Sequence, residues 1–178
     1  MLRPYLAALV ILAIPISLCY AQDAEYYVIS GDKCFFAGQY DKAVAEYEKV
    51  KNLLAGEFSI YYRLGLAYEK MDDLDKALES FQKSFELNPN HLDTCLHLAI
   101  INSYKSDWNK SIQYFKEVSR LQPMDLFYKY CLAEVYFEMG DRQGALDEIK
   151  RIREIGTKSI DNKLSLRIEE LEKALGRI

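Results

Sequence analysis

The chain has 178 residues, half of them hydrophobic, with few prolines (4) and glycines (8). This composition allows a continuous apolar core and disfavours both disorder and a turn-rich all-β fold. The formal net charge of −4 disfavours nucleic acid as a partner, because binding nucleic acid rests on neutralising phosphates. We expect one domain or an elongated repeat array.

The N-terminus has the features of a secretory signal peptide. Arg3 precedes an apolar run over residues 6–18, and Ala21 is a small residue suited to cleavage. The run is shorter than the about 20 residues that span a bilayer, so we predict a signal peptide over residues 1–21. An uncleaved membrane anchor is one alternative, and a lipoprotein signal acylated at Cys19 is another. We expect an exported protein, on the periplasmic or extracellular side of the membrane. It would contact the membrane only if this segment is retained or lipidated.

The stretch over residues 58–89 predicts a pair of amphipathic helices. Apolar residues fall at helical spacing first over residues 58–71 and again over residues 74–85. Asp72 and Asp73 interrupt the pattern and offer an N-cap for the second helix. Pro89 ends that helix, because proline disfavours helix in the residue before it. Two helices alone cannot bury both apolar stripes, so this hairpin needs copies on either side.

The hairpin recurs along the chain. Pro123 lies 34 residues after Pro89, and the order of key residues resembles the tetratricopeptide repeat (TPR), a helix-turn-helix unit of about 34 residues. The residues that carry this resemblance are Tyr61, Leu64, Gly65, Tyr68, Ala77, Phe81 and Pro89. The resemblance implies an all-α fold, a right-handed α-solenoid of four TPR hairpins plus a C-terminal capping helix, with nine helices after the signal. The repeats are expected at residues 24–57, 58–91, 92–125 and 126–159, and the capping helix at residues 160–176.

The resemblance also implies a binding face. In this family the first helices line a concave groove that binds extended or helical peptide segments. Register from the small residues Gly31, Gly65, Ala99 and Ala133 assigns positions to this groove. They are Val28, Asp32, Phe35, Phe36, Tyr62, Leu66, Glu69, Lys70, Leu96, Ile100, Ser103, Tyr104, Phe127, Tyr130, Glu134, Phe137 and Glu138.

The composition of these groove positions suggests the kind of ligand. Their many aromatic residues predict an exposed apolar patch, although some rings could pack against neighbouring helices instead. The lysine, arginine and asparagine clamp by which some family members bind chaperone carboxylates is absent. With Asp32, Glu69, Glu134 and Glu138 nearby, we expect a protein segment with apolar anchors and some positive charge.

Catalytic chemistry is not visible in the sequence. His91 and His97 do not share a helix face, and there is no phosphate-binding glycine loop, so we expect no enzyme, metal or cofactor. Cys34, Cys95 and Cys131 are expected to be unpaired packing residues.

The leading hypothesis is therefore a non-enzymatic, exported adaptor that binds a partner segment in its groove. The alternative is a structural subunit of a cell-envelope assembly that docks through its convex face or its capping helix.

The signal-peptide interpretation predicts a mature chain that begins at Gln22. Intact mass of the protein purified from its native cell should match that start. A start at Cys19 with attached lipid would establish the lipoprotein alternative, and a retained Met1 the membrane anchor.

Overall fold

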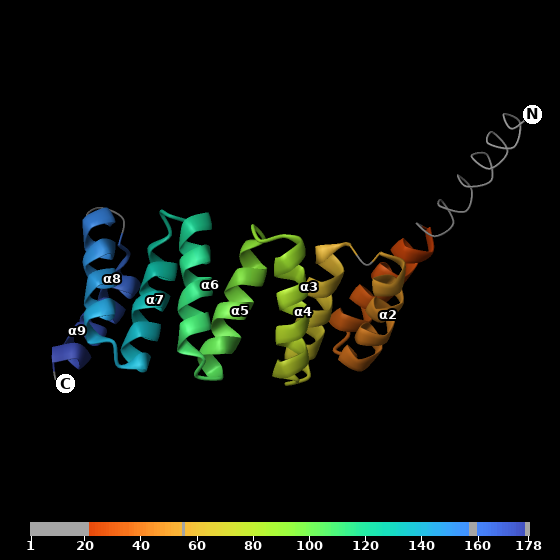
Figure 1. The fold of residues 1–178 in the computed structure, drawn as a ribbon, viewed down its shortest axis with the longest axis horizontal. Helices are drawn as coiled ribbons and strands as arrows, with labels where there is room; N and C mark the ends of the chain where they lie inside the picture. Colours follow the sequence, from red (N-terminus) through yellow and green to blue (C-terminus); the bar gives the residue numbers. More distant parts are fainter. Residues whose placement is uncertain (1–21, 55, 157–159, 177–178) are drawn as a thin grey trace, which may run out of the picture. The chain divides into compact units, whose positions relative to one another are not determined.

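The computed structural model describes residues 22–54, 56–156 and 160–176, and their regular structure is entirely helical. The predicted all-α fold is confirmed, because no β-strand occurs in these residues. The predicted signal peptide lies outside them. The helices span residues 22–36, α2 Tyr40–Leu53, α3 Phe58–Lys70, α4 Leu74–Leu87, α5 Leu92–Tyr104, α6 Trp108–Leu121, α7 Leu126–Met139, α8 Arg142–Ile155 and α9 Asn162–Gly176 (Figure 1).

The chain divides into two compact units, residues 1–88 and residues 89–178, which are described separately. In the first unit α3 packs against both α2 and α4. In the second unit α5 pairs with α6 and α7 with α8, while α6 also packs on α7. None of the described helices has the length and apolar character needed to cross a membrane.

A left-handed residue ends the first helix of each hairpin. Gly38, Asp72, Ser106 and Gly140 have φ values of 74°, 61°, 57° and 85°, and they follow one another at intervals of 34 residues. After each of them, the backbone N–H donates to the carbonyl oxygen five residues back, at 2.8 to 3.0 Å. This is the hydrogen bond of a helix C-cap that reverses the chain, so all four hairpins turn in the same way.

The residue after each left-handed position is the N-cap of the second helix. The carboxylates of Asp73, Asp107 and Asp141 accept hydrogen bonds from backbone N–H groups three residues on, and the first of them confirms the cap predicted at Asp72–Asp73. The hydrogen bond from Lys76 holds the pKa of the Asp73 carboxyl below its usual range. Gln39 occupies the same position in the first hairpin and makes no side-chain cap.

Within a hairpin a small residue on the first helix faces a large one on the second. A Cβ at Gly65 would lie 2.6 Å from the nearest atoms of the Phe81 ring, and a Cβ at Gly31 would overlap the Tyr47 ring. Both rings are buried. Because there is no room for a Cβ atom at either position, a larger residue would push the two helices apart, and the glycines set their closest approach.

Helix α9 closes the second unit. It begins at Asn162, two residues later than predicted. The Asp161 side chain accepts a hydrogen bond from the backbone N–H of Leu164 at 2.7 Å, so Asp161 is the N-cap of this helix. Ile168, Leu171 and Leu175 are buried in one core cluster with residues of α7 and α8. The apolar side of the tail therefore covers the last hairpin, as its pattern predicted.

The missing cap gives a prediction about stability. Gln39→Asp should raise the free energy of unfolding by about 0.5–2 kcal/mol, because an aspartate there can accept from the start of α2. Lys42 stands where Lys76 and Lys110 pair with their caps, so the new carboxylate also gains an ion pair. Chemical denaturation at pH 7 is the measurement.

The gain should vanish below about pH 4, since the stabilising form of the cap is the carboxylate. Asp107→Ala is the matched control: it removes an existing N-cap and should lower the free energy of unfolding by a similar amount. Equal stability of Gln39→Asp and the natural chain would show that this turn does not need a cap.

Candidate functional site

A hollow of about 250 Å³ opens between α5 and α7 in the second unit. It brings together five of the predicted groove residues. They are Ile100, Ser103, Tyr104, Glu134 and Glu138. Tyr104 is 79% exposed at its edge, and the buried ring of Phe115 contributes to its wall. Apolar side chains, one exposed tyrosine and two carboxylates thus share one surface, and such a surface suits a peptide better than a reacting substrate.

The other end of α7 carries a second cluster of predicted residues. The Tyr130 hydroxyl donates a 2.7 Å hydrogen bond to Glu134, and burial together with this bond raises the pKa of Tyr130. The guanidinium of Arg167, on α9, lies 5.5 Å from the centre of the Tyr130 ring and 5.8 Å from that of Phe127. A cation from the capping helix therefore lies beside these two predicted residues of α7.

In the first unit Asp32 is held by two other helices. It accepts a 2.7 Å hydrogen bond from the Tyr47 hydroxyl on α2 and forms a 3.3 Å ion pair with Arg63 on α3. Burial and the hydrogen bond to Asp32 raise the pKa of Tyr47. Tyr62 packs against Phe81, with ring centres 5.9 Å apart. Through these contacts the predicted groove residues Asp32 and Tyr62 pack against side chains of other helices in the unit.

Exposure differs among the predicted groove residues. Phe36, Lys70, Tyr104, Phe127 and Glu138 are exposed, and Tyr130 is buried with 4% of its surface accessible. The remaining predicted residues are half-buried: Val28, Asp32, Phe35, Tyr62, Leu66, Glu69, Leu96, Ile100, Ser103, Glu134 and Phe137.

Two features of this face could not be read from the sequence. The Tyr130 ring does not face outward, because α9 covers it with Arg167. Two of the four acidic residues also have partners within the chain: Asp32 is paired with Arg63, and Glu134 accepts a hydrogen bond from Tyr130. Sequence reasoning missed both arginines: Arg63 stands outside the groove register of α3, and Arg167 follows the last repeat.

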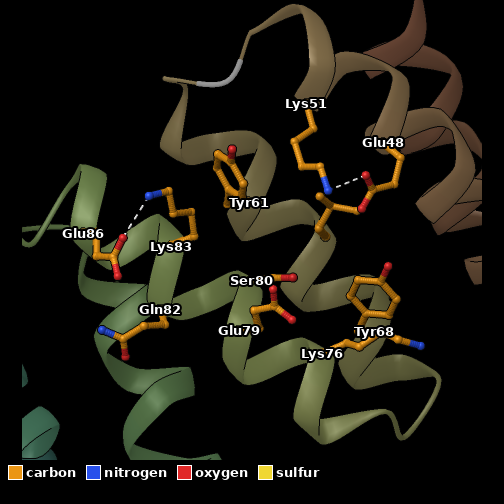
Figure 2. A pocket seen from close by; sticks show the side chains of 11 residues that line it. Glu48, Lys51, Tyr61, Tyr68, Lys76, Glu79, Ser80, Gln82, Lys83 and Glu86 are labelled. Atoms are coloured by element: carbon orange, nitrogen blue, oxygen red, sulfur yellow. Dashed lines mark hydrogen bonds and ion pairs between the residues drawn. The ribbon is translucent and has the colours of Figure 1, made fainter.

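A different hollow, of about 450 Å³, lies between α2 and α4 with α3 at its base (Figure 2). Tyr61 and Tyr68 flank it, with Ser80 between them. Lys51 pairs with Glu48 at 2.5 Å and Lys83 with Glu86 at 3.0 Å. Its positive and negative side chains thus largely balance one another, and it contains none of the predicted groove residues.

Metal and thiol chemistry have little support in the described part of the chain. No group of three or more His, Cys, Asp or Glu side chains in these residues could hold a metal ion. Cys34, Cys95 and Cys131 are free thiols, as predicted. Burial raises the pKa of Cys95 to about 11 and that of Cys131 to about 12, so both stay protonated at neutral pH.

Comparison with known proteins supports the repeat assignment. Residues 58–91 match the tetratricopeptide repeat family. The photosystem I assembly protein Ycf3 of Acaryochloris marina is 30% identical over 103 residues, which cover 56% of this chain and 62% of the relative. The anaphase-promoting complex subunit 3 of Schizosaccharomyces pombe is 25% identical over 134 residues, which cover 74% of this chain and 20% of the relative. The chain thus spans less than two thirds of either protein.

Solved structures share the fold. The MamA protein has a TM-score of 0.71 at 20% identity, with 88% of each chain covered. YrrB, described as a TPR protein with an unusual peptide-binding site, has a TM-score of 0.68 at 19% identity, with 84% of this chain and 74% of YrrB covered. The predicted fold class, an α-solenoid of tetratricopeptide-type hairpins, is confirmed.

The raised thiol pKa values predict slow labelling in the folded protein. At pH 8, Cys95 and Cys131 should react with a thiol reagent far more slowly than in denaturant, because the thiolate is the nucleophile. Their contribution to stability is full below the unfolded pKa near 8.5 and is lost as the pH rises toward 11 and 12. Peptide mass mapping of the labelled chain distinguishes the sites. Rapid modification of Cys131 in the folded protein would contradict this account.

Proposed function

We propose that this TPR-type protein is a non-enzymatic, exported adaptor that binds a segment of a partner protein along its first helices. The segment carries apolar anchors and at least one positive charge. Tetratricopeptide repeats bind protein or peptide partners, and the chain carries one such repeat at residues 58–91. Export rests on the N-terminal sequence, in which a short apolar run follows Arg3.

The hollow between α5 and α7 is the observation that carries the proposal. Ile100 and Tyr104 offer apolar surface there, and Glu134 and Glu138 supply negative charge beside it. An exposed aromatic ring next to a hollow is a typical anchor point, because a ligand that covers it removes a large apolar area from water. A basic side chain of the segment would meet the two carboxylates.

The hollow between α2 and α4 favours a second candidate function. It is lined by the second helices α2 and α4 and by α3 residues outside the predicted groove, so a partner bound there would leave the groove residues free. A structural subunit of an envelope assembly could dock through this side of the first unit. Its paired lysines and glutamates favour polar contacts with low net charge over an apolar anchor.

Tyr104→Ala should weaken partner binding by about 2 kcal/mol, roughly thirtyfold, because a few aromatic anchors usually carry most of the energy of an interface. Since Tyr104 is 79% exposed, the free energy of unfolding should change by less than about 0.5 kcal/mol. Tyr62→Ala should weaken binding as well, with a larger effect on stability because its ring packs on Phe81. The partner is first captured by the chain beginning at Gln22 from envelope extract, and is then titrated against each variant.

Lys83→Ala is the control on the opposite side. Lys83 is exposed and paired only along its own helix, and exposed ion pairs contribute little, so binding should be unchanged. Normal binding by both tyrosine variants together with weakened binding by Lys83→Ala would reject the groove and favour the structural subunit.

A further inference from the structure

Arg167 is a cation held in place by aromatic rings. It projects from α9, and its guanidinium lies 5.8 Å from the centre of the Phe127 ring and 5.5 Å from that of Tyr130. Both rings belong to α7, the helix that also lines the hollow facing α5. Stacking of this kind restrains a guanidinium while leaving the N–H groups at its edge free to donate.

Two arginines of α8 in the second unit have polar partners. Arg153, on α8, makes two hydrogen bonds to Glu172 at 3.0 and 2.8 Å, and Arg151 forms an ion pair with Glu148. Arg167 has no hydrogen bond or ion pair with any residue that the structure describes. Glu134, on the adjoining turn of α7, accepts a hydrogen bond from the Tyr130 hydroxyl and forms no direct ion pair with Arg167. A half-buried guanidinium thus lies against two aromatic rings and makes no direct ion pair within the described residues.

We infer that Arg167 binds an acidic side chain of the partner segment. A carboxylate fits the planar donor edge of a guanidinium with two parallel hydrogen bonds, and such charge-assisted bonds are the strong ones. Phe127 is 45% exposed beside the cation, so the acidic residue should have an apolar neighbour. This inference rests on the proposed function and adds a second charge to the ligand.

The length of α7 gives the spacing of the two charges. Phe127 and Glu138 lie 11 residues apart on one helix, which corresponds to roughly 16 Å at about 1.5 Å per residue. An extended segment covers that distance in about five residues. The expected ligand is therefore dipolar, with an acidic residue near Arg167 and a basic residue about five positions away near Glu138.

Selection from a random dodecapeptide phage library on the immobilised full chain tests this. Peptides selected on the natural chain should share an acidic residue at a fixed distance from a basic one. Arg167→Gln should abolish the acidic preference and keep the basic one. Arg153→Gln is the matched control, because it removes an arginine near α9 that already has a partner, and it should select the same peptides as the natural chain.

The strongest selected peptide is then synthesised with Asp and with Asn at the acidic position. The natural chain should bind the Asn peptide about tenfold more weakly, whereas Arg167→Gln should bind the two equally. Arg167→Lys keeps the charge without the planar fork and should retain only part of the difference. Circular dichroism and thermal melts show whether each variant is folded, and Arg167→Gln should melt close to the natural chain.

Each other result contradicts the inference in a recognisable way. An acidic preference that survives in Arg167→Gln, or that is absent on the natural chain, overturns the role of Arg167 and leaves the groove proposal intact. If amidation of the C-terminus weakens binding while Asp→Asn does not, a terminal carboxylate is the ligand and the side-chain assignment is wrong. If the natural chain selects no peptide, both the inference and the proposed groove function fail.

Discussion

The tight turn inside each hairpin is the constraint on which the other contacts depend. One left-handed residue reverses the chain, and the next residue both closes the first helix and begins the second. From Asp72, for example, Gly65 lies seven residues back and Phe81 nine residues on, so the turn determines which side chains meet across the hairpin. The same turn orients the predicted groove residues of each first helix, because it determines how that helix packs against the second one.

The hairpins were predictable because their causes are local. Helical spacing, aspartates before the second helices and the small residues Gly31 and Gly65 all act within one repeat. The left-handed backbone conformation of Asp72 and Ser106 was harder to predict from the sequence, because neither residue is glycine. Only the 34-residue interval relates them to Gly38 and Gly140. A sequence pattern within one repeat gives no such signal.

The candidate site was predictable only in part, because its character depends on contacts between helices of different repeats. Ile100 and Tyr104 lie four residues apart on α5, and with Glu138 of α7 they line one hollow. The repeat register could not indicate that α9 would cover Tyr130 or supply Arg167, because the rotation of a helix outside the repeats follows from packing rather than from the 34-residue period. The tyrosine hydroxyls that bind Asp32 and Glu134 are likewise tertiary contacts, and they fix two carboxylates that the sequence alone presented as free.

The constant interval between the turns also limits how this chain can change in length. Each residue added to an α-helix rotates everything beyond it by about 100°, since a turn holds about 3.6 residues. One residue inserted between Gly65 and Asp72 would swing the glycine away from Phe81 and place a side chain against the ring. Insertion of a whole repeat of 34 residues keeps every cap and every close contact in phase. Duplication or loss of complete hairpins is therefore the change in length that this architecture accommodates at the least structural cost.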